Sequence, residues 1–240
     1  MHASNRTSGA GTAKRSRQAA TFVGLALLIS GAAGNEAQAF AKSAGQRHTE
    51  GVRYVVQRFN PNTPRSDVAR AVIEIYRDQC TALGLPPGRC TVFLPRDFPL
   101  NVNLILGRIN GTPQYKSQLT MLLRTVERAP TLRVLRKDLA SARIRGARTL
   151  RGAERKNFDD AVSIAVASAT LWAPRTEGGL GGGGIRPPKT PVQGKLNWKI
   201  NWKHVLRDDL IGCLGGLVGG ACPEGAIIGS AISVIEQVLE

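Results

Sequence analysis

The chain is poor in the side chains on which catalysis, metal binding and base recognition usually depend. Among its 240 residues, aromatic residues make up 5%, and there are three histidines and four cysteines. It contains no C-x-x-C pair and no H-E-x-x-H, G-x-S-x-G or Walker motif, which are common signatures of zinc, redox, hydrolase and nucleotide sites. We therefore assign no catalytic residue, no metal ligand and no cofactor. An enzyme whose site is assembled from distant residues stays open as a third hypothesis.

Long apolar runs are also missing. A helix that crosses a bilayer needs about 20 apolar residues. The main apolar segments are shorter, with 11, 13 and 11 residues at positions 19–29, 210–222 and 225–235. The two C-terminal segments are separated by Pro223-Glu224, and neither is long enough to span a membrane alone.

The first apolar segment belongs to an export signal. It follows the basic residues Lys14, Arg15 and Arg17, and small residues after it end in Ala37-Gln38-Ala39. This order is that of a secretory signal peptide, residues 1–39, with an A-x-A cleavage site. We predict a mature chain that begins at Phe40 and is periplasmic or secreted. An uncleaved signal anchor is the alternative.

Acidic residues are scarce, with 17 Asp and Glu against 33 Lys and Arg, a net charge of +16. The excess lies in residues 40–203, which hold 28 basic and 11 acidic residues, whereas residues 204–240 hold one basic and five acidic residues. A basic body favours acidic partners, namely a membrane surface, an acidic polysaccharide or nucleic acid. The ratio of Arg to Lys, 24 to 9, suits bidentate contacts with phosphate or carboxylate. Alternatively, it reflects the base composition of the genome.

The densest basic stretch covers residues 124–156, with 11 basic and three acidic residues. It contains no aromatic residue on which a base could stack, so sequence-specific nucleic-acid recognition is not expected. We expect Arg148, Arg151 and Arg155 to share a helix face. A solvated helix face is the alternative interpretation of the whole stretch. The candidate polyanion-binding residues are Arg133, Arg136, Lys137, Arg143, Arg145, Arg148, Arg151 and Arg155.

All four cysteines follow the predicted cleavage site. An even number of cysteines in an exported chain favours two disulfides. Three pairings are possible, and we predict Cys80–Cys90 and Cys213–Cys222 because each pair closes a short ring that contains glycine or proline. Free buried thiols are the alternative.

The hydrophobic pattern predicts a mainly α fold. Apolar residues recur at spacings of three and four in residues 63–83, 113–128 and 131–151, which indicates amphipathic helices. Residues 157–172 predict a buried helix, while residues 49–59 and 101–109 fit either a strand or a short helix. We place a basic, mostly helical domain at residues 40–176 and a Gly/Pro-rich linker at residues 177–195.

The C-terminal part, residues 196–240, begins with alternating apolar and polar residues up to Lys203, which fit a strand or one helix face. Glycines then recur at spacings of four, as Gly212, Gly216 and Gly220 and, after Pro223, as Gly225 and Gly229. On a helix they form a flat strip that another backbone can approach closely, and we expect a helical hairpin. The predicted packing strip comprises Gly212, Gly216, Gly220, Gly225 and Gly229.

The segment from Trp202 onwards resembles the glycine-zipper segments of bacterial envelope proteins and of bacteriocin-like secreted peptides. The resemblance implies that the tail packs against a membrane, a partner or a second copy of itself. Our first hypothesis is therefore an exported, non-enzymatic protein that uses this tail. The second is a periplasmic or secreted binder of acidic polymers, in which the hairpin is part of the core.

Overall fold

The computed structural model describes residues 42–83, 85, 90, 101–183, 185 and 200–239. The predicted signal peptide, most of the predicted linker and residues 196–199 lie outside this part of the chain. Within it, 79% of the residues are helical and none is in a strand, which confirms the mainly α prediction. The helices are α2 (Ala44–Arg58), α3 (Val68–Ala82), α5 (Val102–Arg108), α6 (Pro113–Arg128), α7 (Leu132–Thr149), α8 (Gly152–Trp172), α9 (Trp202–Val218) and α10 (Cys222–Val238).

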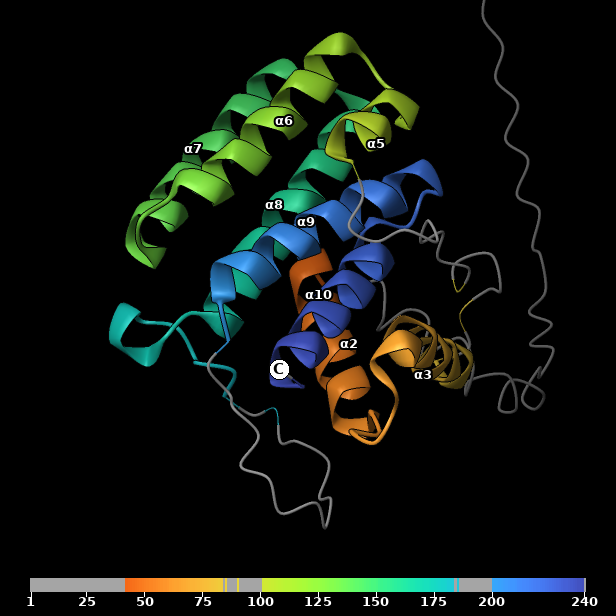
Figure 1. Cartoon of the computed structure of the whole chain (residues 1–240). Coiled ribbons are helices and arrows are strands. Elements are labelled where there is room, and N and C mark those ends of the chain that lie inside the picture. The colour runs from red at the N-terminus through yellow and green to blue at the C-terminus, as the bar shows by residue number, and fades with distance from the viewer. Residues whose placement is uncertain are drawn as a thin grey trace, which may run out of the picture.

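Helix α8 is at the centre of the arrangement. It contacts α2, α6, α7, α9 and α10, and Figure 1 shows the α6–α7 pair on one side of it and the α9–α10 pair on the other. Its sequence explains this position, because Ala161, Ala165 and Ala169 are fully buried and small enough to admit neighbouring helices. Helix α3 lies at the far end of the molecule from α7 (Figure 1).

Side-chain caps fix where several helices begin. Ser43 and Gln46 form a capping box at α2, and Thr112 and Thr131 accept hydrogen bonds from backbone N–H groups of α6 and α7. These caps satisfy donors that have no partner within the helix. The two ambiguous segments, 49–59 and 101–109, are helical as α2 and α5, and α2 begins earlier than its pattern indicated.

The break between α7 and α8 corrects one sequence expectation. Helix α7 ends at Thr149, and Leu150 and Arg151 are extended, with ψ of 155° and 162°. Arg148, Arg151 and Arg155 therefore do not share a helix face. Helix α8 also begins at Gly152 rather than at residue 157, because Gly152 takes a φ of 50°, which lets the chain re-enter a helix at once.

The described start of the predicted linker is folded against α8. Its backbone N–H groups donate to the last carbonyl groups of that helix, from Leu180 to Thr170 (2.8 Å) and from Gly182 to Leu171 (2.7 Å). Gly178 and Gly182 have φ of 81° and 71°, which favours glycine. This described start of the predicted linker therefore caps the C-terminal end of α8.

The residues on either side of the linker contribute to one hydrophobic core. Val52 of α2, Leu135 of α7 and Ile228 of α10 all have no exposed surface and belong to the same cluster. Trp202 begins α9, so this end of the alternating segment is helical. In the described ranges, none of the helices combines the length and apolar character that crossing a bilayer requires.

Candidate functional site

The predicted glycine strip lies where α9 and α10 come closest. A methyl group added to Gly212 would collide with the carbonyl of Gly225, and one added to Gly225 would collide with the carbonyl of Gly212. Gly229 lies against the carbonyl of Asp208, with 2.6 Å between that oxygen and an added Cβ, and Gly216 lies against the carbonyl of Ala221. Four predicted glycines therefore allow direct contact between two backbones.

Gly220 does not belong to this strip. It lies in the turn between α9 and α10 with a φ of 78°, and nothing lies within 4 Å of an added Cβ. Regular spacing placed it on the helix face, but α9 ends at Val218. Its role is to adopt a backbone conformation that other residues rarely adopt.

Most of α10 is covered by the body of the protein. Every residue from position 221 to 235 is buried, and α10 packs against α2, α3 and α8 as well as α9. The partner of the glycine strip in this fold is thus the chain itself.

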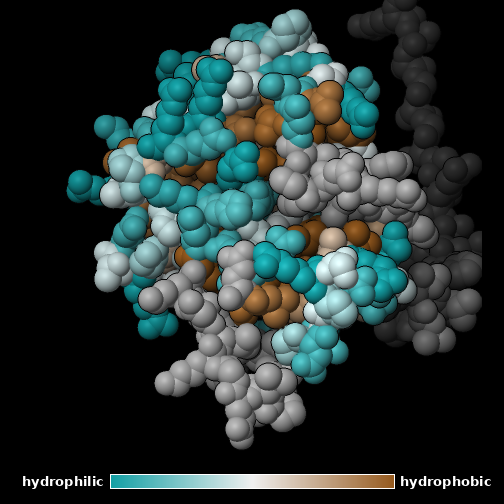
Figure 2. All heavy atoms as spheres, viewed as in Figure 1, coloured by the Kyte–Doolittle hydropathy of each residue, from teal (hydrophilic) through white to brown (hydrophobic). Residues whose placement is uncertain are grey.

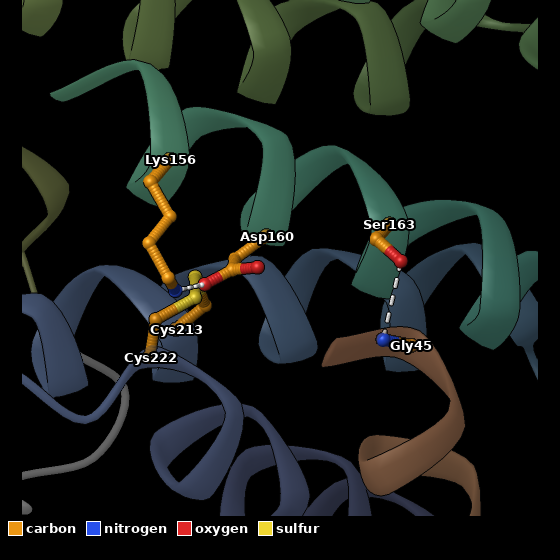
Figure 3. The surroundings of a disulfide bond; sticks show 6 residues. All are labelled: Gly45, Lys156, Asp160, Ser163, Cys213 and Cys222. Carbon is orange, nitrogen blue, oxygen red and sulfur yellow. Dashed lines mark hydrogen bonds and ion pairs between the residues drawn. A yellow bond between two sulfur atoms is a disulfide. The ribbon is translucent and has the colours of Figure 1, made fainter. Parts of the chain in front are cut away.

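Both predicted disulfides are present. Cys80 and Cys90 have a Cα–Cα distance of 5.7 Å, and Cys213 and Cys222 one of 4.0 Å, and the structure contains no free cysteine in the part it describes. The second bond joins α9 to α10 across their turn. Figure 3 shows it beside the Lys156–Asp160 pair of α8, whose Nζ–Oδ2 distance is 2.6 Å.

The eight candidate basic residues are all exposed, but they fall into two groups. Four have partners within the protein. Arg136 donates to Thr170 Oγ1 (3.1 Å) and to the Gly178 carbonyl (3.3 Å), and Arg151 donates to three carbonyls at the end of α7. Arg143 and Arg155 both lie within 4 Å of Asp159. Arg136 and Arg143 thus join α7 to α8, Arg151 caps the end of α7, and Arg155 pairs within α8.

The other four are Arg133, Lys137, Arg145 and Arg148. Their side chains have no hydrogen bond or ion pair with the described residues. Arg133, Lys137 and Arg148 lie on the side of α7 away from its buried residues Leu135 and Leu139, because those positions differ by about half a helical turn. Arg145 lies about a quarter of a turn from the buried face and borders α6. Figure 2 shows hydrophilic side chains over much of this α6–α7 end of the molecule. This surface offers unpaired positive charge to an outside partner.

A hollow of about 370 Å³ lies on the same end, between α6 and α7. Arg124 and Arg128 of α6 and Arg145 of α7 line it, together with Asp138. Arg124 and Arg128 are not among the residues predicted from the sequence, although their spacing of four places them on one face of α6 together with Met121.

Two other hollows lie at the start of α2 and are lined by side chains of both charges. One of about 400 Å³ is lined by Arg53 and Arg143, which contact the Gly183 carbonyl (3.4 Å) and Asp159 (3.8 Å). The other, of about 270 Å³ beside the Cys213–Cys222 bond, is lined by the paired Lys156 and Asp160. The described residues that line them carry a formal charge of +1 in each hollow, against +2 in the hollow between α6 and α7.

A buried polar cluster connects α2 and α9. His48 Nε2 lies 3.5 Å from Asp209 Oδ2, and both side chains have no exposed surface. The pKa of the neighbouring Asp208 carboxyl is raised, chiefly by burial, while the hydrogen bond from Ser233 and the nearby His204 and Arg207 oppose that shift. None of the three hollows described above is lined by these residues, so we assign them to the core.

The sequence predicted neither the buried His48 of α2 nor the buried carboxylates of α9 that form this cluster. Asp208 and Asp209 lie in the second turn of α9 and are both buried. The spacing of His48 from Val52, Val55 and Val56 along one helix face was the signal that pointed to its burial.

Comparison with known proteins gives no further guide to the site: no family model, no curated protein and no solved structure matches this chain.

Proposed function

We propose that the protein is exported and binds acidic polymers through the outer face of α7 and the adjoining face of α6. The observation that carries the proposal is the set of unpaired basic side chains on α7, at Arg133, Lys137, Arg145 and Arg148. Unpaired charge on an exposed helix binds a polyanion by releasing the counterions of the polymer. Paired charge would first have to break its internal contacts.

The packing of the hairpin supports this function over the use of the tail at a membrane or partner. The glycine strip is occupied by the facing helix, and residues 221–235 are buried. For the tail to act on a membrane or partner, α10 would have to leave α2, α8 and α9 and expose Ile228 and Ile232, which are buried in the core. The basic surface needs no such rearrangement.

Export rests on the signal-like N-terminus and is supported by the two disulfides, which persist in oxidising compartments. Intact-mass measurement of the protein recovered outside the cytoplasm tests it. We expect a mature chain that begins at Phe40. Recovery of that protein with residues 1–39 still attached would contradict the cleavage claim.

Binding is tested by titrating the mature protein onto heparin, poly-L-glutamate and a 12-nucleotide oligo-dT at several salt concentrations. With about four contacts, the logarithm of the affinity should fall with the logarithm of the salt concentration with a slope of roughly −3 on a flexible strand. Absence of binding to all three polymers at low salt would contradict the proposal.

A further inference from the structure

The hollow between α6 and α7, which we call the α6–α7 groove, is lined by apolar, hydroxyl and acidic side chains as well as basic ones. Binding of a polyanion by charge alone would require only the basic side chains. One wall comes from α6, with Met121, Arg124, Thr125 and Arg128, and the other from α7, with Val134, Asp138 and Arg145. Val134 and Arg145 are 11 residues apart, so the groove follows α7 for about 16 Å at the helical rise of 1.5 Å per residue.

Three guanidinium groups are available along this groove. Arg124, Arg128 and Arg145 are exposed and have no ion pair or hydrogen bond with the described residues. The nearest acidic residue of α6, Glu127, is instead paired with Arg207 of α9 at 3.2 Å. Arginine forks fit carboxylate, sulfate and phosphate groups with two parallel hydrogen bonds. The groove is therefore built for more than one oxoanion group.

Asp138 is the residue that narrows the class of ligand. It lies among the three arginines, is partly exposed and has no partner within the described part of the chain. A carboxylate repels a polymer that offers only negative charge. It is useful where the ligand also offers hydroxyl donors, because a carboxylate accepts strong hydrogen bonds from O–H groups.

The apolar part of the groove agrees with such a ligand. Met121 and Val134 line it beside Thr125, and none of its described lining residues is aromatic. Nucleic-acid bases bind mainly by stacking on aromatic rings, whereas the C–H face of a sugar ring can lie on aliphatic groups. We infer that the α6–α7 groove binds an acidic polysaccharide, with the arginines on its carboxylate or sulfate groups and Asp138 on its sugar hydroxyls. This inference rests on the proposed binding of acidic polymers and names the polymer.

Asp138→Ala separates this inference from general polyanion binding, because the two predict changes of opposite sign. The substitution makes the surface more positive, so electrostatics alone strengthens the binding of every polyanion. If Asp138 accepts hydrogen bonds from sugar hydroxyls, affinity for a heparin hexasaccharide should fall about tenfold, the size expected for a hydrogen bond to a charged group. Affinities for poly-L-glutamate and the 12-nucleotide oligo-dT should rise or stay unchanged.

Two further variants keep the result interpretable. Asp78→Ala removes an exposed acidic residue from α3 and should not weaken the binding of any of the three probes. Asp138→Asn keeps an accepting oxygen and should lose less hexasaccharide affinity than Asp138→Ala, with unfolding curves confirming that each variant is folded. Stronger binding of all three probes by Asp138→Ala, or weaker binding of all three, would overturn the inference and leave the basic surface as a polyanion site. Failure of the wild-type protein to bind any probe would overturn both proposals.

Discussion

Gly212 and Gly225 are the residues at which the backbones of α9 and α10 touch. A glycine in a helix interior costs about 1 kcal/mol relative to alanine, and here that cost is offset by the burial that close approach allows. The same residue type acts differently elsewhere, since Gly220 supplies a positive φ and Gly107 of α5 has open space around its Cα. The environment of each glycine therefore decides whether its replacement by alanine raises or lowers the stability of the protein.

Gly212→Ala should destabilise the protein and Gly107→Ala should stabilise it. The methyl group at position 212 collides with backbone atoms of α10, which cannot rotate away, and overpacking of this kind costs about 1–3 kcal/mol. The methyl group at position 107 meets nothing within 4 Å and should gain about 0.5–1 kcal/mol from helix propensity. Denaturant unfolding measures both changes, and equal effects of the two substitutions would show that α9 and α10 are not in backbone contact.

Asp208 should make stability depend on pH in the acidic range. Burial raises the pKa of its carboxyl in the folded protein, whereas in the unfolded chain it titrates near 3.9. The folded state therefore binds the proton more tightly, so the free energy of unfolding falls as pH rises from about 4 through the raised pKa.

Asp208→Asn removes this dependence while keeping an oxygen that can accept from Ser233. The variant should gain stability relative to wild type as pH rises through that window, and the difference should then level off. Parallel thermal or denaturant unfolding at several pH values measures it. A difference that is the same at every pH would contradict the buried, proton-binding state of Asp208.

At the scale of elements, the α9–α10 hairpin is held by its glycine contacts and by the Cys213–Cys222 disulfide. Closing a ring of about ten residues stabilises a protein by roughly 2.5 kcal/mol in the chain-entropy account. The ring closed by Cys80 and Cys90 has almost the same length, so that account predicts nearly equal effects for the two bonds.

Replacing both cysteines of a pair by alanine should therefore cost about 2–3 kcal/mol for either disulfide, with an additional cost for the hairpin pair. Cys213 and Cys222 are 0% and 3% exposed, so their removal also leaves a cavity in the core, whereas Cys90 is only partly buried. Equilibrium unfolding of the two double variants compares them. A smaller loss for the hairpin pair than for the Cys80–Cys90 pair would contradict this ranking.

The elements that the sequence predicted best are those whose apolar residues face one side. Helices α3, α6 and α7 follow directly from spacings of three and four, and their caps confirm where α6 and α7 begin. The start of α8 was missed because Gly152 and the charged residues after it resemble a loop. The alternating segment before α9 could not be assigned because its period fits a strand and a helix face equally well.

The sequence predicted which basic residues are exposed, but not which of them are bound to other residues of the protein. Exposure of Arg133 and Arg148 follows from the helical period of α7. That Arg136 instead binds Thr170 and Gly178 depends on how α7 docks on α8, which no local pattern encodes. The glycine spacing likewise predicted a packing face, but its coverage by α2 and α8 depends on contacts between residues that are far apart in the chain.

At the scale of the whole molecule, positive charge and apolar packing are separated. Most residues of α9 and α10 lie inside the core, whereas the basic side chains of residues 124–156 lie at the surface of the α6–α7 end, where Figure 2 shows many hydrophilic residues beside hydrophobic patches. Such a separation lets one end bind a charged polymer without disturbing the fold. Helix α3, at the other end of the molecule, provides a natural control surface (Figure 1).

The central claim is that α7, rather than the net charge of the protein, binds acidic polymers. The most direct measurement is the salt dependence of heparin affinity for two triple variants of equal charge: Arg133→Gln, Lys137→Gln and Arg148→Gln on α7, and Arg58→Gln, Arg70→Gln and Arg77→Gln on α2 and α3. In the α7 variant the slope of log affinity against log salt should become less steep by about 2, because each lost contact reduces its magnitude by about 0.7–0.9. The control variant should keep the wild-type slope. Equal losses in the two variants would contradict the claim and show that binding follows net charge alone.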